Sequence, residues 1–236
     1  MVRGVPSPWG QAAKSIFEIK GMPCVRAHQE RDDPDGFLRE WSGQESFPVV
    51  AYERERPRTG WAEILLLAER VAPTPALIPA DPEQRTLLFG LAHEICGEMG
   101  LAWCSRLLMI HAALQQDPSN DFMVGFGAKY GYAPAAVAAA PRRAADVLRQ
   151  LDACLARSRA AGGRYLLGRE LSALDVYWAT FSNLLEPLPP EQLRMPDMFR
   201  AMFTATDPDI RAALAPALLA HRDFVFAEHL RLPVVC

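Results

Sequence analysis

The stretch that decides the fold is RYLLGRELSALDVYWATF, residues 164–181. Ser172 precedes an apolar run with helical spacing. Asp175 lies three residues after Ser172, and this spacing is the pattern of a capping box. Such a pair satisfies backbone N–H groups that the first turn of a helix leaves unpaired. Leu171 and Val176 stand where a hydrophobic staple would fix the entry of the chain. Because this pattern accounts for the Asp175 carboxylate, we interpret it as structural rather than as a general acid or base.

Around this segment, the chain reads as helix after helix from residue 81 onward. A long helix is predicted over residues 81–116, because apolar residues recur there at three- and four-residue steps. The members of this stripe are Leu87, Leu91, Ile95, Met99, Trp103, Leu107, Ile110 and Leu114. Further helices are predicted over residues 120–130, 135–161, 173–186, 192–204 and 207–230.

Residues 1–72 have a different pattern, in which short alternating runs are mixed with helices. The first helix is predicted to begin at Ser7-Pro8, with Ser7 as N-cap, and to end at Gly21. With two further helices and four strands, this helix makes up a βαβαββα order, whose first strand has only Met1–Val5 available to it. The remaining predicted elements are strands at 24–30, 47–55 and just after 57–59, and helices at 34–43 and 61–71.

A proline-rich connector, VAPTPALIPADP, separates the two patterns. Its four prolines exclude a continuous helix and favour an extended chain. We therefore predict a first domain over residues 1–72, a linker over 73–80 and an all-helical domain over 81–236.

This order resembles that of the cytosolic glutathione transferases over nearly the whole chain. Three motifs carry the resemblance: SPWGQAAKSIFEIKGMPC at 7–24, SFPVV at 46–50, and the stretch at 164–181. The first is similar to the opening turn and helix of bacterial-type members with serine at the helix-one position. The resemblance implies an α+β two-domain fold, in which a thioredoxin-like βαβαββα domain binds glutathione and an all-α domain follows.

The resemblance makes Ser7 the candidate catalytic residue. Its hydroxyl would donate a hydrogen bond to the glutathione sulfur, and the positive end of the helix beside Trp9 would also stabilise the thiolate. The alternative is that Ser7 only caps its helix. The resemblance also makes Pro48 a cis-proline after Phe47, with the backbone of Val49 clamping the cysteinyl part of glutathione. A trans turn proline is the alternative.

The third part of the implied glutathione site departs from the family. An acidic residue followed by Ser or Thr is expected before the last helix of the first domain, whereas this sequence has Gly60 and Trp61 there. Each charge-assisted hydrogen bond lost costs ~1.5–3 kcal/mol, or roughly tenfold to a hundredfold in affinity. The Trp61 amide remains available to the ligand, while its indole is wide enough to close the pocket. The resemblance therefore implies an atypical glutathione pocket.

The electrophilic substrate would lie between the domains. Met99 and Trp103 are the candidate wall residues, with plain core packing as the alternative. Trp9 either stacks on an aromatic substrate or packs between the domains.

Composition limits the remaining partners. The net charge of −3 and the absence of a basic block disfavour nucleic acid and anionic membranes as partners. The five cysteines are scattered, and HEICG at 93–97 lacks the second histidine of HExxH, so neither a disulfide framework nor a metal site is expected. No signal peptide or membrane span is apparent, which makes the cytoplasm the expected compartment. A homodimer is implied by the resemblance alone.

Two functions follow. The first is a glutathione S-transferase-like enzyme that transfers the glutathione thiolate to a small apolar electrophile. The second is a non-catalytic binding or assembly protein of the same fold that has lost glutathione binding. A thiol–disulfide reductase is a weaker third reading, because Ser7 stands where such an enzyme needs its nucleophilic cysteine.

Overall fold

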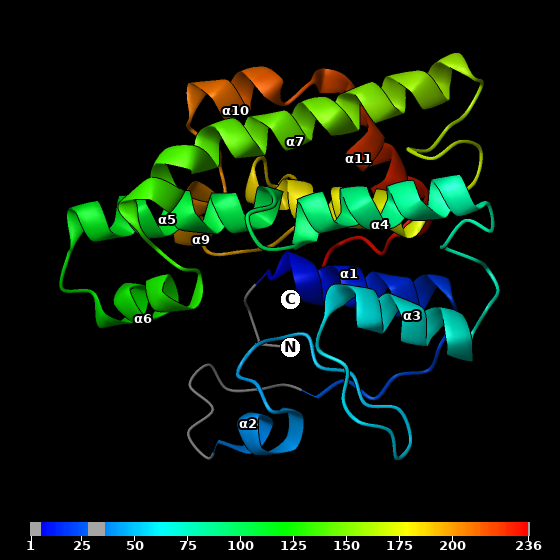
Figure 1. The fold of residues 1–236 in the computed structure, drawn as a ribbon, viewed down its shortest axis with the longest axis horizontal. Coiled ribbons are helices and arrows are strands. Elements are labelled where there is room, and N and C mark those ends of the chain that lie inside the picture. Colours follow the sequence, from blue (N-terminus) through cyan, green and yellow to red (C-terminus); the bar gives the residue numbers. More distant parts are fainter. Residues whose placement is uncertain (1–5, 28–35, 236) are drawn as a thin grey trace.

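The computed structural model describes residues 6–27 and 36–235, which fold around a central helix (Figure 1). In the N-terminal part the helices are α1 (Pro8–Ile19), α2 (Phe37–Ser42) and α3 (Trp61–Val71). The helices that follow are α4 (Pro82–Cys96), α5 (Leu101–Gln116), α6 (Asp121–Lys129), α7 (Pro134–Ala160), α8 (Ala173–Phe181), the 3-10 helix η1 (Ser182–Leu184), α9 (Asp197–Met202), α10 (Pro208–Ala213) and α11 (Pro216–His229).

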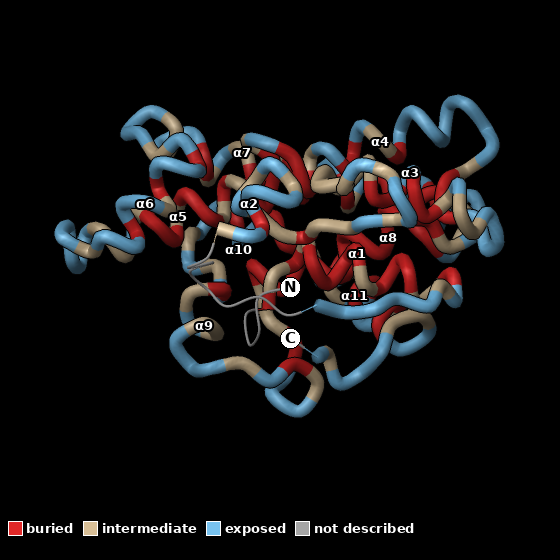
Figure 2. Tube along the Cα trace, turned by 90° about the horizontal axis from the view of Figure 1, so that it is seen from below, coloured by how far each residue is buried: buried red, intermediate tan, exposed pale blue. Residues whose placement is uncertain are grey.

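Helix α8 forms the centre of the core. All nine of its residues are buried, and α1, α4 and α11 pack against it. Figure 2 shows the buried residues concentrated in α8 and the helices around it, whereas α6 is mostly exposed at one end. A helix that is apolar on all sides is stable only when it is enclosed, so α8 joins the N-terminal helices to the rest of the chain.

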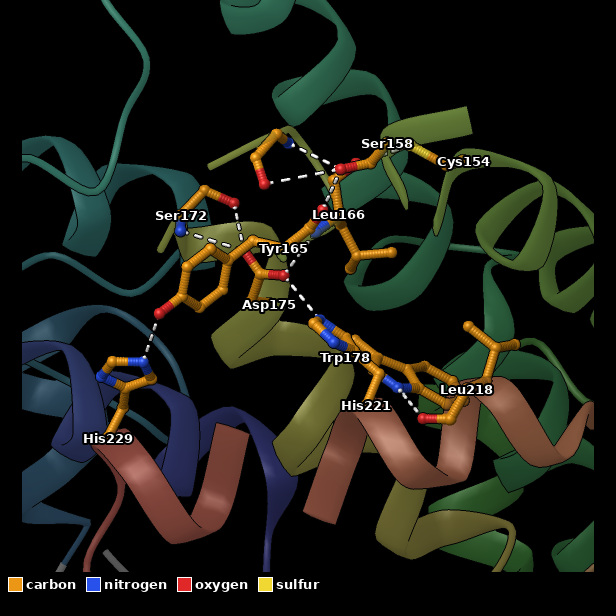
Figure 3. Close-up of polar contacts among 11 residues, drawn as sticks. Cys154, Ser158, Tyr165, Leu166, Ser172, Asp175, Trp178, Leu218, His221 and His229 are labelled. Atoms are coloured by element: carbon orange, nitrogen blue, oxygen red, sulfur yellow. Dashed lines mark hydrogen bonds and ion pairs between the residues drawn. The ribbon is translucent and has the colours of Figure 1, made fainter. Parts of the chain in front are cut away.

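The predicted capping box at the start of α8 is confirmed. The Asp175 Oδ2 accepts hydrogen bonds from the Ser172 N–H at 2.9 Å and from the Ser172 hydroxyl at 2.7 Å. Its Oδ1 accepts a third from the Leu166 N–H at 2.8 Å (Figure 3). The carboxylate is fully buried, and these contacts give it a structural role, as predicted.

The long helix predicted over 81–116 is wrong, because the chain breaks into α4 and α5 at residues 97–100. Met99 adopts a positive φ of 54° within the break. A Cβ on Gly97 would lie 2.5 Å from the His93 ring, and one on Gly100 would lie 2.5 Å from the Glu94 carbonyl oxygen. Two glycines thus allow a close backbone turn where the apolar periodicity alone indicated a continuous helix.

The strands expected in the first domain are not formed over the described residues. Val50 and Arg58 make one isolated antiparallel bridge, with N–H to carbonyl distances of 2.9 and 2.7 Å. Extending this bridge toward the N-terminus would require an N–H group from Pro48, and proline has none. Extension toward the C-terminus is also blocked, because the Tyr52 carbonyl accepts a hydrogen bond from the Glu55 N–H within a turn. Residues 24–27 have no regular structure, and the rest of the predicted strand at 24–30, like that at 1–5, lies outside the described residues.

Three further helix predictions need correction. The helix expected over 192–204 is reduced to α9, with prolines at 189, 190 and 196 preceding it. The helix expected over 207–230 is divided into α10 and α11, because Pro216 lacks the N–H that would continue α10 and instead occupies the first turn of α11. The helix predicted over 173–186 ends earlier, as α8 followed by η1.

The proline-rich connector is fixed to the end of α1. Lys20, whose side chain is fully buried, forms an ion pair with Glu69 at 2.7 Å. Its Nζ also donates to the carbonyls of Ala72 and Pro75, each at 2.8 Å. These contacts hold the predicted linker against the N-terminal helices, so that the two parts of the chain have a defined relation.

Candidate functional site

The N-terminus of α1 presents Ser7 and Pro8 as predicted. Ser7 is the N-cap residue with extended backbone geometry, and its carbonyl accepts the first helical hydrogen bond from the Gln11 N–H at 2.9 Å. Its hydroxyl, however, makes no capping hydrogen bond, and the first turn carries no acidic residue. The hydroxyl is therefore not used as the cap of its own helix, which was the alternative reading of Ser7.

Three of the predicted site segments meet in one small pocket. The Phe47-Pro48 peptide bond is cis, as expected. The pocket has a volume of about 210 Å³, including solvent at its mouth. Four predicted site residues do not line it but lie next to or near lining residues in the sequence: Ser7, Phe47, Val49 and Gly60. Its lining residues are Trp9, Ala13, Ile16, Pro48, Trp61, Ile64, Tyr177 and Phe181.

Trp9 connects α1 to the helical part of the chain. Its indole N–H donates to the Cys96 carbonyl at 3.0 Å, and its ring lies edge-to-face on Phe181 with centroids 5.0 Å apart. These contacts fix the ring between the two regions. They agree with the alternative in which Trp9 packs between the domains. The side chain also lines part of the pocket.

Trp61 also packs toward the helical part. Its ring meets Tyr177 edge-to-face at 5.5 Å and lies 6.3 Å from Phe89. The Tyr177 hydroxyl donates to the Trp61 carbonyl at 3.2 Å, and complete burial raises the pKa of that phenol well above its usual range. The indole therefore narrows the pocket on the side where the γ-glutamyl end of glutathione was expected.

The start of α3 already holds a carboxylate, which the sequence reasoning missed. Glu63 Oε2 accepts from the Gly60 N–H at 3.3 Å and, at 3.5 Å, from the Thr59 N–H. Arg56 donates to Oε1 at 2.7 Å, and this contact, with the two backbone N–H groups, lowers the pKa of Glu63. A glutamate three residues after the N-cap Gly60 was the available signal, because that position reaches back to the helix start.

Met99 and Trp103 do not line this pocket. The Trp103 indole N–H donates to the Tyr130 carbonyl at 3.0 Å, and the two rings lie 4.7 Å apart. Met99 occupies the break between α4 and α5, where its carbonyl accepts from Arg143 Nε at 3.2 Å. Both residues are packed against the core, which was the alternative reading for them.

The histidines of the described residues lie apart from one another. His111 contacts the Tyr132 hydroxyl at 2.8 Å, His229 contacts the Tyr165 hydroxyl at 2.9 Å, and His221 contacts Asp175 at 2.8 Å. Over residues 6–27 and 36–235, no group of three or more metal-ligating side chains is found. His28 lies outside these ranges. Within the same ranges, no helix is both long and apolar enough to cross a bilayer.

Comparison with solved structures identifies the fold. No protein-family model matches the chain, and no curated protein matches it. A glutathione S-transferase domain-containing protein from Marinobacter aquaeolei matches with a TM-score of 0.65 at 16% identity, over 98% of each chain. Glutathione transferase Omega 3C from Trametes versicolor matches with a TM-score of 0.63 at 16% identity, over 97% of this chain and 85% of that one.

A third structure has a ligand. It is a glutathione S-transferase from Methylobacterium radiotolerans in complex with glutathione sulfonate, with a TM-score of 0.62 at 18% identity, covering 96% of this chain and 89% of that one. Similarity at this level of identity establishes the architecture and not the activity. The glutathione transferase fold predicted from the sequence is thus confirmed, while the predicted site residues and domain limits stay predictions.

Proposed function

We propose that this chain, which has the fold of the cytosolic glutathione transferases, binds glutathione at the N-terminus of α1 and transfers its thiolate to a small, largely apolar electrophile. The observation that carries the proposal is the Ser7 hydroxyl, which precedes a twelve-residue helix and does not cap it. A free hydroxyl at the positive end of a helix is suited to an anionic sulfur.

Each part of the site has a separate task in this mechanism. The Ser7 O–H donates to the glutathione sulfur, which lowers the thiol pKa and releases its proton to solvent. The backbone of Val49, after the cis-proline, pairs with the cysteinyl part of the tripeptide. The sulfur then attacks the electrophilic carbon, forming an S–C bond as the leaving group departs or as the electron pair moves onto the acceptor.

The residues present fit one end of glutathione better than the other. The start of α1 carries no carboxylate that would repel the thiolate. At the start of α3, by contrast, Glu63 already contacts the amides of Thr59 and Gly60, where the γ-glutamyl carboxylate was expected. This contact, together with the small pocket narrowed by Trp61, supports a second candidate function: a binding or assembly protein of the same fold that does not use glutathione.

Calorimetry with glutathione separates the two candidates. A ligand that binds only the folded state must raise its stability, so heat of binding and a higher melting temperature at millimolar glutathione are expected for the transferase.

A kinetic test of the transferase uses the Ser7→Ala variant. This variant should slow conjugation of a model aryl halide about a hundredfold, because a hydrogen bond to a charged group is worth ~1.5–3 kcal/mol. Ser119→Ala, on an exposed turn, is the matched control. No binding to the wild-type chain would favour the second function.

We further propose a cytoplasmic homodimer. Leu66 of α3 and Leu87 of α4 are 43% and 39% exposed, at the end of the first region and the beginning of the second. Pairing of these surfaces would remove both side chains from water. Light scattering after size exclusion is expected to give twice the chain mass of 26.1 kDa, and a lower mass in the double variant Leu66→Glu, Leu87→Glu.

A further inference from the structure

Arg106 is a buried cation without a counter-ion. It lies in the middle of α5 with 7% of its surface exposed. Its Nη1 donates to the Met109 sulfur at 3.4 Å, and its Nε has no hydrogen-bond partner. Among the described residues, no aspartate or glutamate forms an ion pair with it. Because buried charges are normally paired, this arrangement calls for an anion that is not part of the chain.

The ionisable groups near Arg106 do not supply it with a counter-ion. Burial lowers the pKa of the guanidinium itself. The phenol of Tyr130 interacts with it: burial raises the pKa of that phenol and the charge of Arg106 opposes the rise. Lys129, the residue before Tyr130, is exposed, and its Nζ lies 5.9 Å from the centre of the Tyr130 ring. Glu45, whose charge acts on Lys129, is exposed and ion-paired with Arg39 at 3.2 Å, so it is not a counter-ion of Arg106.

The remaining neighbours are aromatic. The Arg106 guanidinium lies 4.8 Å from the centre of the Phe203 ring, and Tyr130 packs on Trp103. Phe203 follows α9, a six-residue helix with no buried residue of its own. An element with so little burial opens at a lower free energy than the core, and a ligand would reach the guanidinium only when α9 and the buried Phe203 move aside together.

We propose that Arg106 and Tyr130 bind the carboxylate of a small acid whose apolar body contacts Trp103 and Phe203. A guanidinium presents parallel N–H donors that match the two oxygens of a carboxylate, and the phenol O–H supplies one more donor. The acid would therefore lie among the helices α5, α6 and α9. Only its role as the electrophilic substrate rests on the proposed function; binding itself does not.

Benzoate binding in the absence of glutathione tests the proposal. Benzoate should raise the melting temperature of the wild-type chain, whereas neutral benzamide and inorganic sulfate should leave it unchanged. In Arg106→Met the affinity for benzoate, measured by calorimetry, should fall about tenfold to a hundredfold, as expected for the loss of charge-assisted hydrogen bonds. The ligand-free variant should be at least as stable as the wild type, because an apolar chain replaces an unpaired charge. Arg142→Met, whose side chain is 89% exposed, should change neither quantity.

Three results would overturn the proposal: no stabilisation of the wild type by benzoate, equal stabilisation by sulfate, or a ligand-free Arg106→Met variant that is less stable than the wild type. Tyr130→Phe, which keeps the ring and removes only the hydroxyl, is a second and independent test. A severalfold loss of benzoate affinity then supports the proposal, and an unchanged affinity contradicts it. Because none of these measurements involves glutathione, failure here is distinct from failure of the proposed transferase.

Discussion

The Nε2 of His221 on α11 lies 2.8 Å from the Oδ1 of Asp175 on α8, and both side chains are buried (Figure 3). The carboxylate that caps α8 therefore also fastens a helix 46 residues further along the chain. Trp178 of α8 donates to the Leu218 carbonyl of α11 at 2.9 Å, which is a second link between the same two helices. One side chain thus serves a local and a tertiary purpose.

Removal of this carboxylate should destabilise the whole chain. Asp175→Ala leaves the N–H groups of Leu166 and Ser172 and the His221 ring without their common acceptor, so the free energy of unfolding should fall by ~3 kcal/mol or more. The measurement is urea denaturation followed by circular dichroism. Asp146→Ala, which removes only surface ion pairs with Arg142 and Arg149, is the control and should cost less than ~1 kcal/mol. A small effect of Asp175→Ala would contradict the assigned role.

The break between α4 and α5 should tolerate no side chain at Gly100. A Cβ there would meet the Glu94 backbone carbonyl at 2.5 Å, and backbone cannot move aside as a flexible side chain can. Gly100→Ala should therefore lower the free energy of unfolding by ~1–3 kcal/mol. Gly90→Ala, within α4 and with nothing within 4 Å of the added Cβ, is expected to stabilise by about 0.5–1 kcal/mol, since alanine favours helix. Equal effects would show that the break is not closely packed.

Glu63 should compete with glutathione for the start of α3. In Glu63→Ala the amides of Thr59 and Gly60 lose their internal acceptor, and Arg56 loses its partner. If the transferase proposal holds, glutathione should bind this variant roughly tenfold more tightly, because one charge-assisted hydrogen bond is worth ~1.5–3 kcal/mol. Isothermal calorimetry gives the affinity, and Glu83→Ala in the exposed first turn of α4 is the control. Weaker binding by Glu63→Ala would instead assign Glu63 to the ligand site.

His229 should make stability depend on pH. Burial lowers the pKa of His229 below its ordinary value of 6.5. The unfolded chain therefore takes up this proton more readily than the native state, so the stabilising contribution is present above pH 6.5 and is lost as the pH falls through the native pKa. Between pH 7 and pH 5, the melting temperature should fall more in the wild type than in His229→Gln. His93→Gln, at an exposed position, should retain the wild-type pH dependence.

Thiol reactivity should distinguish Cys24 from the buried cysteines. Cys24 is exposed, and partial burial of its thiol raises its pKa, whereas burial raises the pKa of Cys104 to about 11 and that of Cys96 well above its usual range. At pH 8 only about one Cys104 thiol in a thousand is ionised, so it should not react. In a Cys236→Ser background, Ellman's reagent should label Cys24 alone in the native state, and Cys24→Ser should abolish labelling until urea is added. Early labelling of Cys154, which is buried, would contradict the packing described.

Helix α3 shows what local sequence can predict. Its bounds at Trp61–Val71 and its four buried residues agree with the apolar pattern of WAEILLLAERV. The capping box of α8 was also predicted from the sequence. Both signals are local, because capping and amphipathic spacing depend on residues within a turn or two of each other. The long helix failed at Gly97 and Gly100 because apolar periodicity carries no information on how closely two backbones approach.

Only part of the candidate site could be predicted from the sequence. The sequence resemblance brought α1, the Pro48 segment and α3 together, and the pocket lined by Trp9, Pro48 and Trp61 agrees with that. It did not indicate Glu63, whose carboxylate turns back to the amides before it, nor Arg106, whose lack of a counter-ion is a property of its whole surroundings.

By itself, the sequence determined where helices α1, α3 and α8 begin and that a proline-rich stretch follows α3. These depend on periodicity, capping and proline chemistry, which act between near neighbours in the chain. The tertiary structure alone decided which polar groups are satisfied and which are not, from the Asp175–His221 link to the unpaired charge of Arg106. The reason is that burial and electrostatic balance are sums over residues distant in sequence, and they are fixed only when the helices pack.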